Sequence, residues 1–204
     1  MPRVLEKRER SLGTKLSIRG ERCNSPKCAL IRKPHRPGQH GKSYRRRTSD
    51  YGAQLKEKQK IQASYGLTNK QLAHLFEEAA KKPESTVLAI TRSLETRLDN
   101  VVMRLGLAPS RSVARQLVSH GHFLVNGKKM NTPSYRVRAS DSITIKPTSK
   151  TIVWFSNLKE ELKNYEVPAW LSLNKENLDG KVESLPLETV FPFDINSVVD
   201  YYSR

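Results

Sequence analysis

The segment RGERCNSPKC holds both cysteines of the chain, Cys23 and Cys28, with four residues between them. A structural zinc site needs four ligands, which commonly come as two closely spaced pairs, and this segment supplies one pair. His35 and His40 could complete a Cys2His2 set, but they lie in a basic loop rich in glycine and proline. A disulfide is disfavoured in the reducing compartment that we expect for this chain. These residues therefore favour reduced cysteines that pack a turn, without a metal or other cofactor.

Catalytic motifs are sparse. The chain has no glycine-rich phosphate loop of the strand-to-helix kind and no His-Glu-x-x-His pattern. The adjacent carboxylates Glu77 and Glu78 lie on a helix face that solvation explains. The five histidines have no partnering nucleophile or carboxylate pattern. We therefore predict that the protein is not an enzyme.

The charge of the chain points to binding instead. Its 37 Lys and Arg against 20 Asp and Glu give a formal net charge of +17, which implies a polyanionic partner. The positive charge is concentrated in residues 1–60 and 91–150, whereas residues 61–90 are neutral and residues 151–204 are slightly acidic. This distribution predicts one long polyanion that is contacted in two places.

Basic side chains in these two regions are the candidate RNA contacts. In the first region they are Arg19, Arg22, Lys27, Arg32, Lys33, Arg36, Lys42, Arg45, Arg46 and Arg47; in the second they are Arg97, Arg104, Arg111, Arg115, Arg136 and Arg138. Arginine makes bidentate contacts with phosphates. RNA is favoured over DNA because no recognition helix with a dimerisation element is evident. A membrane surface is disfavoured, because the basic N-terminus lacks an amphipathic helix with an aromatic face.

The elements expected to position these residues begin with a loop-rich arm. Residues 1–48 contain many glycines and prolines and little periodicity, which predicts an extended segment. Residues 50–66 are typical of a basic helix that ends at a glycine, and Ser49 and Asp50 are its candidate caps. Thr68 and Gln71 form a capping-box pattern before another helix, and a further helix is expected over 85–94.

Residues 97–150 show helical periodicity first and strand-like alternation after it. The periodicity predicts a helix that ends near Gly106 and a second helix between Ser110 and Gly121, with Arg111 and Arg115 on its polar face. An Asn126-Gly127 hairpin turn and an alternating partner strand, SITIK, should follow. The pattern predicts a compact αα-ββ module.

The last part of the chain is acidic and rich in aromatic residues. A helix is expected over 152–165, short strands after Pro168 and a closing helix or turn. We interpret the rings mainly as packing against the helical domain rather than as a base-stacking platform. The expected fold is α+β, and the expected domains are an arm over 1–48, a helical domain over 49–96, the αα-ββ RNA-binding module over 97–150 and a C-terminal segment over 151–204 that packs back on the helical domain. The chain has no apolar run typical of a signal sequence or a membrane span, so we expect a cytoplasmic protein.

Residues 97–137 resemble the RNA-binding module named after protein four of the small ribosomal subunit. The flanking motifs GERCNSPKC, RPGQHGK, SDYGAQLKEKQK, PAWLSLN and YYSR resemble the full-length bacterial-type family, and the resemblance runs from about residue 19 to residue 204. The resemblance implies a structural constituent of the small subunit that binds ribosomal RNA at a helix junction in the 5′ domain and nucleates assembly of the body. It also implies support of decoding accuracy with protein five, a place with protein three near the channel where messenger RNA enters, no homo-oligomer, and in some bacteria repression of its own messenger. The ribosome could be bacterial or organellar.

The family's RNA contacts carry over to matching positions of this chain. In the module they are Arg111, Arg115, His120, His122, Asn126, Lys128, Tyr135 and Arg136, over a core of Leu98, Val101, Leu117 and Val125; in the arm they are Arg22, Lys27, Arg36, His40, Lys42 and Arg45 to Arg47.

The resemblance also bears on the cysteines. Some family members carry a second cysteine pair upstream, which completes a zinc knuckle. Here the corresponding stretch reads LEKRER, with Glu6 and Glu9 at the same spacing. Glutamates are poor substitutes in a closed zinc site but can pair with nearby arginines. We predict that Cys23 and Cys28 are a residual half of the knuckle, with no metal, and that the turn survives.

Other functions remain as alternatives. An RNA-modifying enzyme with the same module, such as a pseudouridine synthase, would need a separate catalytic domain, for which only residues 151–204 and the arm are left. A free-standing RNA-binding regulator would not need the long arm or the family's C-terminal motifs.

Overall fold

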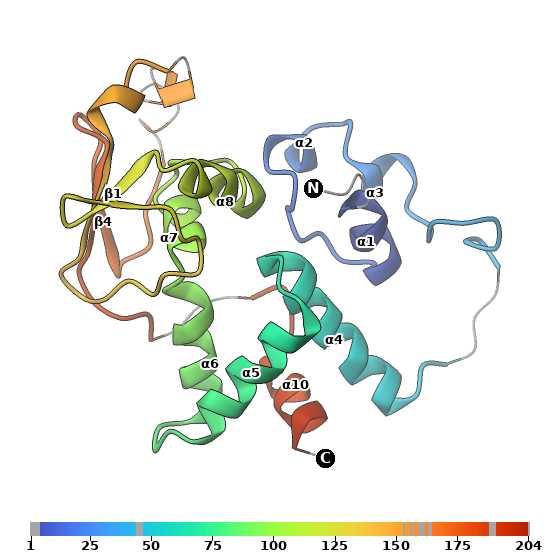
Figure 1. Cartoon of the computed structure of the whole chain (residues 1–204). Helices are drawn as coiled ribbons and strands as arrows, with labels where there is room; N and C mark the ends of the chain where they lie inside the picture. Colours follow the sequence, from blue (N-terminus) through green and yellow to red (C-terminus); the bar gives the residue numbers. More distant parts are fainter. Residues whose placement is uncertain are drawn as a thin grey trace. The chain divides into compact units, whose positions relative to one another are not determined.

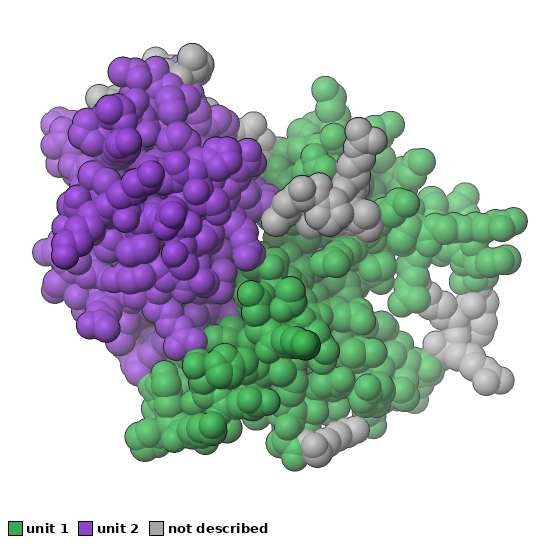
Figure 2. All heavy atoms as spheres, in the orientation of Figure 1, with its two compact units in different colours: residues 1–90, 188–204 green, residues 91–187 purple. Residues whose placement is uncertain are grey.

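A computed structural model describes residues 5–43, 47–152, 154–155, 157–158, 162, 165–187 and 191–203. The chain divides into two compact units (Figure 2), of which unit 1 comprises Met1–Ile90 with Glu188–Arg204 and unit 2 comprises Thr91–Leu187. Both units contain helices, and unit 2 also contains an antiparallel sheet, so the expected α+β class is confirmed. Among the described residues, none of the helices combines the length and apolarity that crossing a bilayer requires.

Unit 1 is helical (Figure 1). Its helices are α1 (Leu5–Leu12), α2 (Glu21–Asn24), α3 (Ala29–Arg32), α4 (Asp50–Tyr65), α5 (Asn69–Ala80) and α10 (Ile195–Tyr202), and α6 (Thr86–Glu95) runs on into unit 2. The Ser49 side chain caps α4, and Gly66 ends it in the left-handed conformation at φ 62°. Thr68 and Gln71 form the capping box of α5. These local predictions are confirmed.

The arm differs from the expectation of an extended segment. It forms α1, α2 and α3, and α1 packs against α3 and α4. Leu16, Ile18 and Ala63 make a small apolar cluster, with Leu12 packed on it. The arm therefore gains its order from contacts with α4, and local sequence patterns carry no signal of a partner so far along the chain.

The C-terminal helix α10 packs against α4 and α5. The Tyr202 and Phe76 ring centroids are 4.5 Å apart. Lys58 is only 6% exposed, and its Nζ lies 4.5 Å from the ring centroid of Tyr201 and 5.0 Å from that of Tyr202. A cation over aromatic faces is favourable, the more so when it is shielded from water. The prediction that the aromatic rings of this segment pack is confirmed for these tyrosines.

In its described residues, unit 2 packs helices and an antiparallel sheet around one core. The elements are α7 (Leu98–Arg104), α8 (Arg111–Ser119), β1 (Phe123–Val125), β2 (Lys128–Met130), β3 (Ser142–Ile145), the 3-10 helix η1 (Pro147–Ser149), β4 (Leu171–Asn174) and β5 (Asp179–Val182). The strand order is β2-β1-β3-β5-β4. Asn126 (φ 50°) and Gly127 (φ 77°) both adopt positive φ between β1 and β2, as a type I′ hairpin turn requires. Leu98, Val101 and Val125 lie in the core, and Leu117 packs against it.

The C-terminal segment departs from its expected place. Residues 171–182 form β4 and β5, and β5 pairs with β3, so these strands extend the sheet of the αα-ββ module. Phe155 and Leu162 are buried in the same core, while other parts of the expected helix over 152–165 lie outside the described residues. Of this segment, α10 is what packs on the helical unit. The strand β5 fits here because Gly180 leaves room for the Leu105 side chain, which a Cβ would overlap.

Candidate RNA-binding surfaces

Two arginines of the candidate set form ion pairs with carboxylates of unit 2. Arg97 is 7% exposed, and its Nε and Nη2 donate to Asp99 Oδ1 (3.1 Å) and Oδ2 (2.8 Å). Arg104 donates from Nε to Glu95 Oε2 (3.0 Å) and from Nη2 to Glu95 Oε1 (3.2 Å). Each guanidinium is thus neutralised by a carboxylate in bidentate geometry. These ion pairs tie both side chains to the fold of the unit, and the Arg104 side chain is still 26% exposed. RNA contact by these two arginines stays a prediction.

A polar network links this interior to the first residue of α8. Glu95 is fully buried and also accepts a hydrogen bond from Asn100 Nδ2 at 2.9 Å. Asn100 Oδ1 in turn accepts from Arg111 Nε at 2.7 Å. The network therefore fixes the guanidinium of Arg111 at the start of the helix. The sequence signal that could have revealed it is the polar run of Glu95, Asp99 and Asn100 within an otherwise apolar pattern.

The polar face of α8 carries two further candidate arginines. Arg111 and Arg115 are both half-buried and lie one turn apart on the helix. Ser110 caps α8 by accepting from the Val113 N–H at 3.4 Å. Long arginine side chains pack their stems on apolar surface while the guanidinium stays at the surface. This geometry suits contact with phosphates.

The hairpin turn is held by Asn126, another candidate. Its Nδ2 donates to Asp141 Oδ1 at 2.8 Å, and its Oδ1 accepts from the Ser142 N–H at 2.9 Å. Asp141 Oδ2 also accepts from the Arg138 N–H at 2.8 Å. Asn126 therefore orders the turn, and Lys128 presents its exposed side chain beside it. Arg136 and Arg138 are exposed on the segment between β2 and β3.

The histidines and the tyrosine of the module differ in exposure. His120 is exposed, whereas His122 is half-buried with its Nδ1 at 2.9 Å from Ser149 Oγ. Burial lowers the pKa of His122, and the neighbouring His120 and Lys146 lower it further. These effects disfavour the charged form of His122, so its ring is suited to a polar contact more than to a charged one. Tyr135 is half-buried and packs against the core.

The arm of unit 1 carries most of the exposed basic candidates. The exposed candidates are Arg19, Arg22, Lys27, Arg32, Lys33, His40, Lys42 and Arg47. Arg36 is half-buried, and Arg45 and Arg46 lie outside the described residues. The exposed side chains add charge at a surface without a desolvation cost, which is the arrangement that attracts a polyanion.

The loop over residues 33–43 is shaped by an arginine that sequence reasoning missed. Arg10 Nε donates to the carbonyl oxygens of Lys33 (3.0 Å) and His35 (3.1 Å), and its Nη2 donates to that of Arg36 (3.4 Å). The loop from Arg36 to Ser43 lines a shallow hollow of about 400 Å³. Within the part of the chain that the structure describes, Arg36 Nε is buried and has no hydrogen-bond partner. The loop is therefore a preformed basic surface and not a free chain.

Replacing Gly41 with alanine is expected to open this loop, because a Cβ at that position would overlap the carbonyl oxygen of Arg36. We expect about a tenfold faster proteolytic cleavage within residues 33–43, which corresponds to about 1.4 kcal/mol of local opening free energy. Limited proteolysis followed by mass spectrometry measures this change. Gln39→Ala is the matched control, since Gln39 is exposed in the same loop. Equal cleavage rates for both variants would show that the loop tolerates the added carbon.

Glu9 organises the turn that contains the cysteines. Glu9 is 2% exposed, and its Oε1 accepts from the backbone N–H groups of Leu16 (3.0 Å) and Ile18 (3.2 Å). Its Oε2 accepts from the Cys23 thiol, with a sulfur-to-oxygen distance of 3.8 Å. Burial raises the pKa of that thiol, and the Glu9 charge adds to the rise against a backbone hydrogen bond from Arg19. Cys23 therefore stays a protonated donor to the carboxylate.

The expected pairing of the glutamates with arginines is confirmed for Glu6, whose Oε1 lies 3.0 Å from Arg22 Nε. The expected pairing with an arginine is wrong for Glu9. This side chain lies on the buried face of α1, where it accepts hydrogen bonds from backbone amides and a thiol. Cys23 and Cys28 are both buried free thiols. Over the described residues, no group of three or more His, Cys, Asp or Glu side chains gathers as a metal site would need. The Glu9 carboxylate links the backbone at Leu16 and Ile18 to the thiol of Cys23. The loss of the zinc from this turn stays a prediction.

Comparison with protein families defines the class of the chain. Residues 96–143 match the S4 domain, and residues 5–95 match the ribosomal protein S4/S9 N-terminal domain. These matches cover α7, α8, β1, β2 and the start of β3, and the arm with α4, α5 and α6. The chain is therefore an S4-domain protein with the N-terminal domain of the ribosomal type.

Similarity over nearly the full length narrows the class to one family. Over 194 residues, 94% of this chain and 93% of each relative, it is 47% identical to the small ribosomal subunit protein uS4 of Thermus thermophilus. It is 45% identical to the uS4 protein of Natranaerobius thermophilus and 47% identical to the uS4A protein of Clostridium botulinum over the same lengths. The chain belongs to the uS4 family of small ribosomal subunit proteins.

Proposed function

We propose that this protein is a structural constituent of the small ribosomal subunit and binds small-subunit ribosomal RNA directly. The observation that carries the proposal is the full-length similarity to uS4 proteins, which includes the arm as well as the S4 domain. The chain carries both the S4 domain and the ribosomal-type N-terminal domain, which fits a member of this family better than an isolated S4 module does. The role is one of binding and assembly, not of catalysis, in the cytoplasm of a bacterial-type translation system.

The charged surfaces of both units support this proposal. Unit 1 presents the exposed arm side chains together with the preformed loop over residues 33–43. Unit 2 presents Arg111 and Arg115 on α8 and Lys128 at the hairpin turn. Fixed guanidinium groups suit the phosphate geometry of a folded RNA, which is read mainly by shape and backbone contacts. The alternative of an RNA-modifying enzyme is less well supported, because β4 and β5 complete the module's own sheet.

The finer parts of the proposal concern the place in the subunit. We propose binding at a helix junction in the 5′ domain, where the protein nucleates assembly of the body. Contacts with small-subunit proteins five and three, support of decoding accuracy and proximity to incoming messenger RNA belong to the same proposal. Reconstitution of subunits with and without this protein, followed by detection of proteins five and three, tests those contacts.

Binding to the 5′ domain of small-subunit ribosomal RNA, compared with transfer RNA, tests the central proposal. Raising the salt concentration from about 50 to 200 mM in a filter-binding assay will weaken both complexes, because phosphate contacts release counterions. We expect a preference of at least about tenfold for the ribosomal fragment to persist at the higher salt, since shape-specific contacts do not depend on charge alone. Arg115→Ala should lower the salt slope by about one. Equal binding to both RNAs at every salt concentration would contradict the assembly role and favour a generic RNA-binding regulator.

A further inference from the structure

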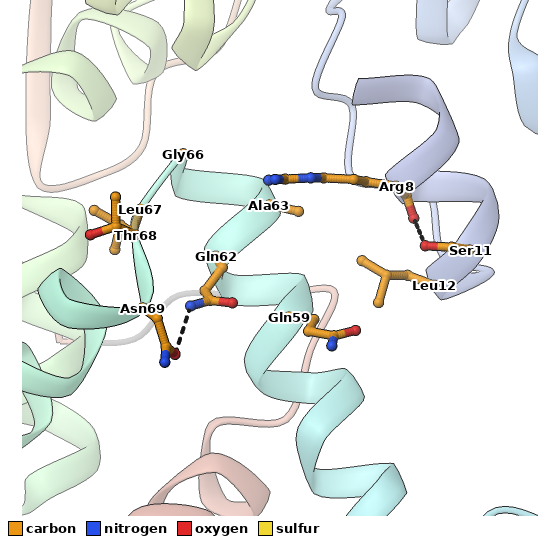
Figure 3. A pocket seen from close by; sticks show the side chains of 10 residues that line it. All are labelled: Arg8, Ser11, Leu12, Gln59, Gln62, Ala63, Gly66, Leu67, Thr68 and Asn69. Carbon is orange, nitrogen blue, oxygen red and sulfur yellow. Dashed lines mark hydrogen bonds between the residues drawn. The ribbon is translucent and has the colours of Figure 1, made fainter. Parts of the chain in front are cut away.

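Unit 1 contains a cavity of about 540 Å³ that the candidate surfaces above do not include. It lies between α1 and the junction of α4 with α5 (Figure 3). Its lining residues are Arg8, Ser11, Leu12, Gln59, Gln62, Ala63, Gly66, Leu67, Thr68 and Asn69. The volume lies within the range of sites that accept small organic groups, about 300–1,000 Å³.

The lining combines an apolar surface with carboxamides. Ala63 and Leu67 are buried, and Leu12 is half-buried beside them. Gln62 Nε2 donates to Asn69 Oδ1 at 3.2 Å, which leaves the Gln62 oxygen as an acceptor and the Asn69 amide nitrogen as a donor. The exposed Gln59 amide has no hydrogen-bond partner within the described residues. The cavity can therefore both donate and accept hydrogen bonds beside an apolar wall.

Arg8 supplies the only charge among the residues that line the cavity in the described chain. Its exposed side chain reaches from α1 toward the last turn of α4 (Figure 3). The guanidinium has no carboxylate partner among the described residues, and the lining contains no acidic side chain. The cavity thus repels cations and offers one site for an anion at its rim.

We propose that this cavity holds one unpaired base of the ribosomal RNA, extruded from its stack, while Arg8 contacts the adjoining phosphate. A base has apolar faces and an edge that carries both donors and acceptors, and these match the apolar wall and the carboxamides. The phosphate of the same nucleotide matches the guanidinium. The inference rests on the proposed function, since it names a contact within the same RNA.

Chemical probing of the complex tests the contact, with dimethyl sulfate for adenine and cytosine, kethoxal for guanine and carbodiimide for uracil. The wild-type protein should protect an unpaired base of the 5′ domain, and the double variant Gln59→Ala/Gln62→Ala should restore its reactivity while other protections persist. The affinity should fall about 5- to 100-fold, as expected for one base contact. The salt slope should stay unchanged for this variant and fall by about one for Arg8→Ala.

Control variants separate the possible outcomes. Asn196→Ala removes an exposed amide on α10 and should leave the footprint unchanged. Gln59→Glu keeps the shape of an exposed side chain and adds negative charge, so it should weaken the contact even if the double variant folds poorly. RNA binding with the same footprint for wild-type protein and both glutamine variants would overturn the cavity proposal and leave the proposed function intact. Loss of affinity without a change at any base would also overturn it, whereas a wild-type protein that does not prefer the ribosomal RNA would contradict the proposed function itself.

Discussion

Replacement of Glu95 by alanine is expected to lower the free energy of unfolding of unit 2 by about 2–4 kcal/mol. The Glu95 carboxylate is fully buried and receives hydrogen bonds from Asn100 and from two nitrogens, Nε and Nη2, on one edge of the Arg104 guanidinium. Without it, the partly buried Arg104 guanidinium loses its carboxylate, and the buried Asn100 amide keeps the backbone oxygen of residue 95 but loses its second acceptor. Arg104 retains some contact with water, which keeps the effect below that of a fully buried pair. Urea unfolding followed by circular dichroism measures the change.

Matched variants show whether the effect belongs to this network. Glu176→Ala removes an exposed carboxylate from the same unit and should change stability by less than about 0.5 kcal/mol. Glu95→Gln keeps the shape of the side chain but loses its charge, so its free energy of unfolding should lie between those of the wild type and Glu95→Ala. A loss below about 1 kcal/mol for Glu95→Ala would contradict the structural role of the network. Because Asn100 also holds Arg111, Asn100→Ala should weaken RNA binding by several-fold with a smaller loss of stability.

Replacement of Glu9 by alanine is expected to open the cysteine turn of the arm at a cost of about 2–4 kcal/mol, because buried donors are left without acceptors. These donors are the N–H groups of Leu16 and Ile18 and the thiol of Cys23. Amide hydrogen exchange at Leu16 and Ile18 should accelerate by about 30-fold or more. Modification of Cys23 by a thiol reagent should accelerate as well, because the wild-type thiol is buried and its pKa is raised.

Glu6→Ala is the control for this variant. Glu6 makes an ion pair with Arg22 in which the Arg22 side chain is about half exposed, so its loss should cost less than about 1 kcal/mol. We predict that Glu9 holds the turn without a metal, so a chelator should leave the exchange rates of the wild-type protein unchanged. Stoichiometric zinc in purified protein, or equal exchange in Glu9→Ala and wild type, would contradict this account.

The sequence by itself determined the elements that depend on neighbouring residues. Ser49 and Gly66 cap the two ends of α4. Thr68 and Gln71 cap α5, and Asn126-Gly127 forms the turn of the hairpin. Each of these features is a local hydrogen bond or a backbone conformation that particular residue types favour, so a short window of sequence is enough. The net charge likewise predicted a polyanionic partner, because charge is additive along the chain.

The tertiary structure alone decided which charged side chains serve the fold and which face outward. Arg97, Arg104 and Arg115 are all arginines, but the first two form ion pairs with buried carboxylates. Glu9 turns inward to amides and a thiol, and β5 joins the edge of β3, through contacts that link distant parts of the chain or depend on burial. Residue type and spacing do not specify the solvent exposure of a side chain or its distant partners. These properties arise when the apolar core closes and every buried polar group must find a partner.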